Sequence, residues 1–160
     1  MEFIHTGKVL EEYAERVKAS YQQQLDSNGK NATGNLRNNI TIEVQQNENV
    51  FEVALNLNEY WKWLETGRPK TQNNGNGELR RAILDWIRVK HIIPTPFNGK
   101  LPTESQLAYL ISRKIHRFGY EGKGLLQKSI DENEQFLMNL ELALLEDIGK
   151  SLEEVLVLFK

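Results

Sequence analysis

The chain of 160 residues contains no cysteine. This absence excludes disulfide bonds, iron–sulfur clusters, thiolate zinc sites and a cysteine nucleophile. The chain also lacks any apolar run close to the roughly 18 residues that a membrane-spanning helix requires. Its first residues show no charged stretch followed by an apolar one, as a secretory signal would. We therefore expect no membrane association and a cytoplasm-type compartment.

Residue patterns typical of enzymes are also scarce. The only three histidines stand at positions 5, 91 and 116, a spacing that matches no metal motif. The nucleophile elbow, the phosphate-binding loop, the dinucleotide glycine pattern and the zinc-protease helix are all missing. A hydrolase would have to use Glu65 or Glu121 as its acid, and the Glu-x-Lys pair at Glu121 lies among glycines that favour a simple turn. We predict no catalytic residues, no metal site and no cofactor.

The composition is that of an ordinary globular domain with an uneven charge distribution. Hydrophobic residues make up 39% and charged residues 26%, which predicts one domain over residues 1–160. Residues 80–128 hold ten Lys or Arg against three acids, whereas residues 129–160 hold eight acids against two Lys. Opposite charges in neighbouring segments suit head-to-tail self-association or a polyanionic neighbour. Neutralisation between helices packed inside one chain is the alternative.

Hydrophobic periodicity predicts an α+β fold. Helical spacing predicts an N-terminal helix over about Gly7 to Leu25. Two alternating segments, with apolar residues at Ile40, Ile42 and Val44 and again from Phe51 to Leu57, predict an antiparallel hairpin with one buried face. Because an isolated hairpin is marginal in water, we expect either further short strands hidden in the loops or strands from a neighbouring subunit.

Three further helices follow the hairpin in this prediction. One runs from about Leu79 to Lys90 and ends before a proline-rich connector over about residues 92–103. Thr103 and Gln106 form a capping-box signature that opens the next helix. The apolar stripe of that helix comprises Leu107, Leu110, Ile111, Ile115 and Phe118. From about Leu126 a last helix of roughly 30 residues is expected.

The stretch from Glu59 to Arg81 combines two tryptophans with a Gly-Arg-Pro break. Helical spacing favours a short helix that places at least one tryptophan in the core and makes Glu65 a helix-end residue. Gly67 is a natural C-cap, after which we expect a mobile loop over about residues 68–78. Long loops of this kind in compact domains are usually functional or bind a partner.

A nucleic-acid-binding regulator is the alternative interpretation. The second and third helices are basic, and Arg113, Lys114 and Arg117 could contact phosphates. The connector between these helices is much longer than the three or four residues of a helix-turn-helix. Contact with nucleic acid without base reading stays open.

The order of these features resembles the tail-completion or head-tail joining proteins of tailed bacteriophages, also described as minor tail or neck proteins. The resemblance spans about residues 31–132. Its motifs are "TGNLRNNITIEV" entering the first strand, "FEVALNL" as the second strand, a Tyr-x4-Glu-x-Gly-Arg-Pro phrase, and "RFGYEGKGLLQKSIDE" before the final helix. The segment from Leu79 to Phe118 is longer than the minimal family pattern.

This resemblance implies a structural virion protein and not an enzyme. It implies a homo-oligomeric ring, of roughly six or twelve subunits, between the portal or adaptor proteins and the tail, with the genome passing through its centre. The protein would then be located in the virion, and in the host cytoplasm during assembly. The residues we expect to face a neighbouring protein or DNA lie in the predicted loop or beside it: Glu65, Gly67, Arg68, Lys70, Arg80 and Arg81.

Overall fold

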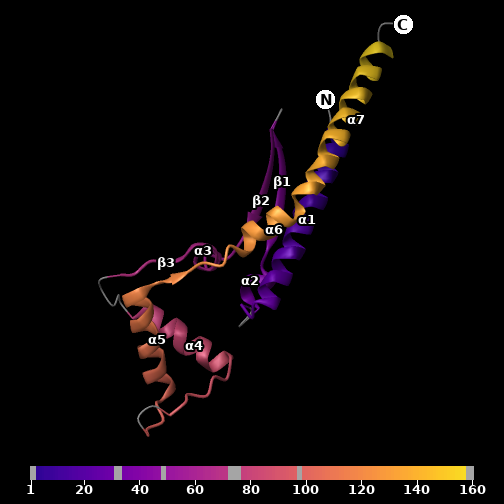
Figure 1. Cartoon of the computed structure of the whole chain (residues 1–160). Helices are drawn as coiled ribbons and strands as arrows, with labels where there is room; N and C mark the ends of the chain where they lie inside the picture. The colour runs from indigo at the N-terminus through magenta and orange to yellow at the C-terminus, as the bar shows by residue number, and fades with distance from the viewer. Residues whose placement is uncertain (1–2, 31–33, 48–49, 72–76, 97–98, 158–160) are drawn as a thin grey trace.

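The computed structural model describes residues 3–30, 34–47, 50–71, 77–96 and 99–157. Its architecture is α+β, with long helices near both ends of the chain and a small antiparallel sheet, as predicted (Figure 1). The elements in chain order are α1 (Ile4–Ser27), α2 (Asn35–Asn38), β1 (Thr41–Asn47), β2 (Val50–Asn56), α3 (Trp61–Thr66), β3 (Gly67–Arg68), α4 (Glu78–Val89), α5 (Glu104–Phe118), β4 (Tyr120–Glu121), α6 (Leu125–Asn133), a 3-10 turn η1 (Glu134–Leu137) and α7 (Met138–Val157).

Helix α1 is the centre of the larger hydrophobic core. It buries one face whose members recur every three or four residues, namely Leu10, Ala14, Val17, Tyr21 and Leu25. The lower part of this face packs with α2, α3 and α6 in one cluster, which also contains Leu36, Leu64 and Leu125. Burial raises the pKa of Tyr21 to about 12. The helix predicted from residue 7 to 25 is confirmed and is longer at both ends.

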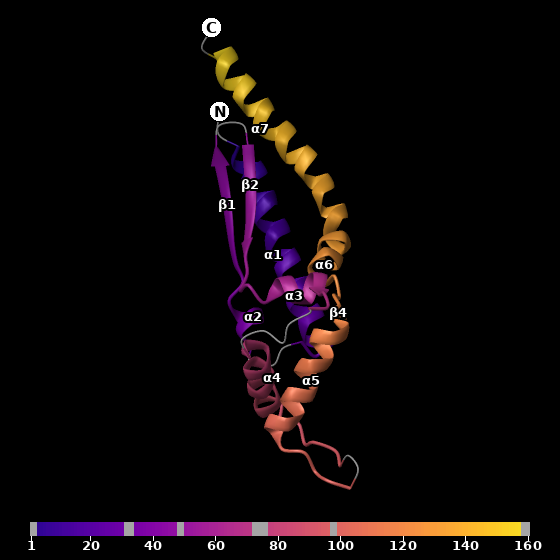
Figure 2. The ribbon, with the colours of Figure 1, turned by 90° about the vertical axis from the view of Figure 1, so that its left-hand side faces the viewer.

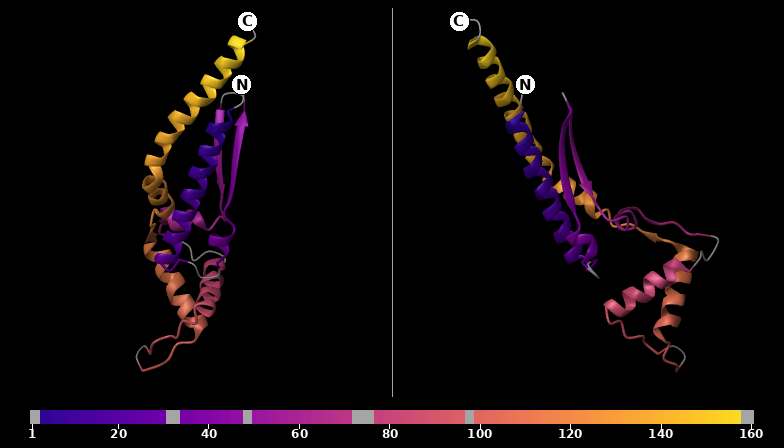
Figure 3. Two further views of the ribbon diagram at one scale, coloured as in Figure 1. Left: turned by 90° about the vertical axis from the view of Figure 1, so that its right-hand side faces the viewer. Right: turned by 180° about the vertical axis from the view of Figure 1, so that it is seen from behind.

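The predicted hairpin is also confirmed. Strands β1 and β2 pair antiparallel, with Ile42 opposite Leu55 and Val44 opposite Val53, so these side chains share one face. That face lies along α1 and is only partly buried (Figure 3). Neither strand has a second strand beside it within the described residues. No described strand therefore pairs with either outer edge of the hairpin.

The sequence left open whether further short strands lie within the loops. Two such strands are present and form a second sheet. Strand β3 pairs antiparallel with β4, with Gly67 opposite Glu121 and Arg68 opposite Tyr120. These strands pair with each other and not with the hairpin. We call the two segments that run side by side here, residues 67–71 and 116–122, the link.

Helices α4 and α5 form a separate pair that projects from the link (Figures 1 and 2). The two helices enclose their own cluster around Ile83, Ile87 and Ala108. The capping box is present, since Thr103 accepts the N–H of Gln106 and the Gln106 side chain accepts the N–H of Thr103. The remaining elements are α1, α2, the β1–β2 hairpin, α3, α6, η1 and α7. We call these elements together the body.

The predicted core stripe of α5 is partly wrong. Leu110 and Phe118 are 50% and 66% exposed, whereas Ala108, Ser112 and His116 are buried. Ala108 packs with Ile83 and Ile87 of α4, and the larger Leu107, Ile111 and Ile115 pack, partly buried, against this cluster. Leu110 and Phe118 are left on the exposed side of α5. The spacing of apolar residues alone did not show which side of α5 is buried against α4.

The final helix is divided into two by a 3-10 turn. Helix α6 ends at Asn133, and after η1 the chain resumes as α7 in a different direction (Figure 2). Helix α7 lies along α1 and then continues beyond the start of α1 (Figures 1 and 3). The prediction of a single final helix of roughly 30 residues is therefore wrong at η1. Three-residue spacing of apolar residues fits both kinds of helix, so the pattern did not reveal the break.

Candidate assembly surfaces

The link holds two backbones closer than any side chain would permit. A Cβ atom added at Gly67 would lie 2.2 Å from the carbonyl oxygen of Tyr120, and one added at Gly122 would lie 1.9 Å from that of Glu65. Gly67 also has a φ of +76°, which favours glycine. Gly67 of the "ETGRP" phrase and Gly122 of the "YEGKG" phrase are thus required where two segments far apart in the sequence cross. Gly67 is buried there and presents no surface to a partner.

Glu65, which belongs to α3, caps the N-terminus of another helix, α6. Its two carboxylate oxygens accept the backbone N–H groups of Leu126, at 3.0 Å, and Gln127, at 2.9 Å, in the first turn of α6. Gly124, the N-cap of α6, has no side chain to do this. A carboxylate at a helix N-terminus satisfies donors that lack partners and interacts favourably with the helix dipole. The residue that sequence offered as an acid or an assembly contact therefore joins α3 to α6.

Arg68 lies across an aromatic ring. Its guanidinium carbon is 5.2 Å from the ring centroid of Trp63, a distance typical of cation–π contact. Trp61 packs, partly buried, against the main core, while Trp63 is 41% exposed. The prediction that at least one of the two tryptophans belongs to the core agrees with this arrangement.

The first residues of the predicted loop, from Arg68 to Thr71, are held in place by backbone pairing. Arg68 belongs to β3, and the N–H of Thr71 donates to the carbonyl oxygen of His116 at 2.8 Å. The Thr71 hydroxyl also bonds Nδ1 of His116, which is buried. Lys70 lies exposed between these two anchor points. Residues 72–76 of the predicted loop lie outside the described residues.

Arg80 and Arg81 lie on α4, away from the paired strands of the link. The Arg80 guanidinium donates to the Ser105 hydroxyl at 2.8 Å and lies 5.6 Å from the ring centroid of Tyr109, so it joins α4 to α5. Arg81 is exposed. The six residues predicted to face a partner are thus spread over α3, β3, the link and α4, and they do not form one site.

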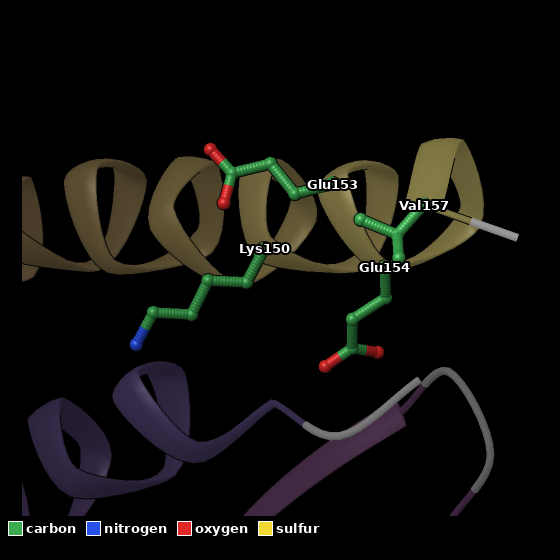
Figure 4. Close-up of a pocket in the computed structure, with 4 residues that line it drawn as sticks. All are labelled: Lys150, Glu153, Glu154 and Val157. Carbon is green, nitrogen blue, oxygen red and sulfur yellow. The ribbon is translucent and has the colours of Figure 1, made fainter. Parts of the chain in front are cut away.

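The described residues contain no metal centre built from His, Asp or Glu side chains. No group of three or more His, Asp or Glu among them could hold a metal ion. One hollow is open to solvent and lies where α7 passes the start of α1 and the hairpin; Lys150, Glu153, Glu154 and Val157 line it (Figure 4). Glu121 lies exposed in β4, in a strand and not in the turn that its glycine neighbours suggested. No helix in these ranges is both long and apolar enough to cross a bilayer.

Two features were missed in the sequence. Asp147 is buried on the inner face of α7 and accepts the N–H groups of His5 and Thr6 and the hydroxyl of Thr6, at 3.1, 2.8 and 2.8 Å. It therefore caps α1, whose own N-cap residue Phe3 has no capping side chain. The second feature is an exposed apolar stripe on α7. The sequence of α7 contains two sets of apolar residues at helical spacing, offset from each other, and this pattern could have revealed the second stripe. Asp147 is the acid that stands in the inner set.

Comparisons of the chain with models of known families, with curated proteins and with solved structures gave no match in any of the three.

Proposed function

We propose that the chain is a structural subunit of a tailed phage, one that forms the ring joining the portal or adaptor proteins to the tail. The proposal starts from the order of sequence motifs that resembles tail-completion and head-tail joining proteins. It assigns no catalytic activity to the chain. It places the protein in the neck or tail of the virion and predicts that the genome passes through the ring.

One observation supports a role in assembly above all others, namely the amount of exposed surface. The solvent-accessible surface is 11847 Å². A compact monomer of this mass, 18.5 kDa, would expose about 8,200 Å². The excess of roughly 3,600 Å² is several times the 800 Å² or so that one partner buries in a standard interface. A ring subunit with a neighbour on each side would bury part of this surface in its two interfaces.

The hairpin supports the same proposal. No described strand pairs with either of its outer edges, and its inner face is only half-buried by α1. Open strand edges pair readily with other chains. A ring in which neighbouring subunits cover these edges would remove this exposure.

The helix-turn-helix alternative loses its geometric basis in the structure. Helix α4 ends at Val89 and α5 begins at Glu104, so residues 90–103 separate them where the motif has three or four residues. Fluorescence anisotropy with duplex DNA at two salt concentrations tests the remaining, sequence-independent contact. Tight binding that weakens steeply with salt would favour the nucleic-acid alternative.

The proposed function is tested by reconstitution. Phage particles made without this chain are expected to accumulate as separate filled heads and tails, and the purified protein is expected to restore joined, infectious particles. A variant with Glu59→Gln, which alters an exposed side chain, is the matched control and should restore joining fully. Joined particles formed in the absence of the chain would contradict the proposal.

A further inference from the structure

Helix α7 has two apolar stripes, and only one of them has a partner. The inner stripe, which includes Leu140, Ala143 and Asp147, lies against α1. The outer stripe repeats at alternating intervals of four and three residues, which is the spacing of a coiled-coil seam. We call this outer stripe the α7 seam; its members are Met138, Leu142, Leu145, Gly149, Leu152 and Leu156.

The five large side chains of the α7 seam are all solvent-exposed, and Gly149 between them is half-buried. The exposed fractions of Met138, Leu142, Leu145, Leu152 and Leu156 are 72, 64, 65, 57 and 65%. A contiguous apolar patch of this kind on a monomer typically marks an interaction site. The last turns of α7 also extend past the start of α1 (Figures 1 and 3).

Acidic residues flank the α7 seam and argue against pairing of two α7 helices. In heptad terms Glu146 and Glu153 occupy e positions and Glu141 a g position. Parallel helices would place Glu141 opposite Glu146 of the other copy, and antiparallel helices would place Glu146 opposite Glu153. Both arrangements oppose like charges. Figure 4 shows Glu153 on the side of α7 that faces away from α1 and the hairpin, while Lys150 and Glu154 point toward them.

Helix α5 has an exposed face with the complementary character. Leu110, Arg113, Lys114, Arg117 and Phe118 recur at three- and four-residue intervals and are all exposed. We call this set the α5 face. The Arg117 guanidinium carbon lies 5.2 Å from the centroid of the Phe118 ring. Among the described residues, no acid forms an ion pair with Arg113, Lys114 or Arg117. The α5 face has an apolar residue at each end and three cations between them. It is therefore complementary to the α7 seam, which is apolar and flanked by acids.

We propose that the α7 seam of one copy docks on the α5 face of a second copy. The contact cannot form within one chain, because the α4–α5 pair and the free end of α7 lie at opposite ends of the molecule (Figures 1 and 3). It is a heterologous contact, which closes into a ring or continues as a filament according to the rotation between copies. The inference deepens the proposed function, on which it rests, by naming the surfaces that join neighbouring subunits.

The absence of cysteine makes the contact directly testable. Two single-cysteine variants, Leu145→Cys on the α7 seam and Leu110→Cys on the α5 face, are mixed at high concentration and treated with a short bismaleimide. Both positions are at least half exposed, so each variant should fold, and circular dichroism verifies this. We expect a cross-linked dimer that contains one copy of each variant. Mass spectrometry of peptides from differently isotope-labelled variants identifies it.

The controls separate this contact from others. Glu12→Cys, on an exposed position of α1, is mixed with Leu110→Cys and should give little product. A dimer formed by Leu145→Cys alone would show pairing of two α7 helices and would overturn the proposal. Absence of any product in the mixture would also overturn it.

Charge reversal provides a second, independent readout. Adding Glu141→Lys and Glu153→Lys to the Leu145→Cys variant should lower the cross-linking yield about tenfold. Adding Arg113→Glu and Arg117→Glu to the Leu110→Cys variant should restore much of the yield when the two altered variants are mixed. Unchanged yield after reversal, or no recovery on recombination, would contradict the proposed contact.

The reconstitution assay distinguishes failure of this contact from failure of the proposed function. If heads and tails are joined by the protein but the cross-link does not form, the contact is wrong and the function stands. If the cross-link forms but the protein does not join heads to tails, the function is wrong and the contact stands.

Discussion

Glu65 and Asp147 each hold distant parts of the chain together by capping a helix that lacks its own capping side chain. Glu65 accepts the N–H groups of Leu126 and Gln127, and Asp147 accepts those of His5 and Thr6. Both are carboxylates at a positive helix end. The two residues therefore join elements that lie far apart in the sequence.

Glu65→Gln should destabilise the protein. Only one oxygen of the amide can accept, so one first-turn N–H of α6 loses its partner and the charge at the helix end is removed. We expect the free energy of unfolding to fall by about 1–2 kcal/mol, measured by urea unfolding followed by circular dichroism. The exposed neighbour substitution Glu59→Gln should change it little. Equal stability of the two variants would show that the cap contributes nothing.

Asp147→Asn should have a larger effect that depends on pH. Burial tends to raise the pKa of Asp147, but the hydrogen bonds from Thr6 and His5 together outweigh burial and hold the pKa below its ordinary value of 3.8. A lowered pKa in the folded state gives stability that is present above the ordinary value and is lost as pH falls through the folded value.

We therefore expect Asp147→Asn to unfold about 2 kcal/mol more easily at neutral pH, with the difference shrinking below about pH 4. Urea unfolding of both proteins at several pH values measures this. Glu141→Gln, at an exposed position of the same helix, is the control. A difference that stays constant down to pH 2 would refute the assigned role of the carboxylate charge.

At the scale of elements, the link is the feature that joins the body to the α4–α5 pair. Gly122→Ala would place a Cβ 1.9 Å from a backbone oxygen, and backbone cannot move aside as a flexible side chain can. We expect a loss of more than about 3 kcal/mol, or failure to fold. Gly7→Ala in α1, where no atom lies within 4 Å, should be neutral or stabilising. Thermal unfolding of the two variants checks this, and comparable melting temperatures would contradict the described crossing.

Much of the fold was predictable at this scale because local rules determine it. Helix α1, the hairpin and the Thr103 capping box follow from periodicity and capping chemistry, which act between neighbours in sequence. The β3–β4 pairing and the Glu65 cap were not predictable, because each joins segments far apart in sequence and neither leaves a periodic signal. The Gly67 and Gly122 positions carried the only trace, as glycines that a tight crossing requires.

The candidate surfaces were less predictable than the fold. Charge counts indicated opposite poles, but they did not show which faces are exposed. Leu110 and Phe118 were expected in the core of α5, and the structure places them on its exposed face. The α7 seam is likewise apolar by sequence and exposed in space, because α1 occupies only the inner side of that helix.

At the scale of the whole molecule, the separation of charge predicts self-association that weakens with salt. Pairs such as Glu153 with Arg113 of another copy would be screened, since the Debye length shortens from about 10 Å at 0.1 M salt to 3 Å at 1 M. We expect sedimentation velocity to show the larger species declining several-fold as salt rises. Arg113→Glu with Arg117→Glu should remove this dependence while leaving the monomer folded. Association that is indifferent to salt would mean that charge does not guide it.

The measurement that tests the proposed function most directly is electron microscopy of the protein bound to the tail-proximal end of filled heads from particles made without it. The account predicts a closed ring of this chain at that end, with a central channel and with each α7 against the α5 of its neighbour. Heads that carry no added density, with the protein remaining as monomers in solution, would contradict it.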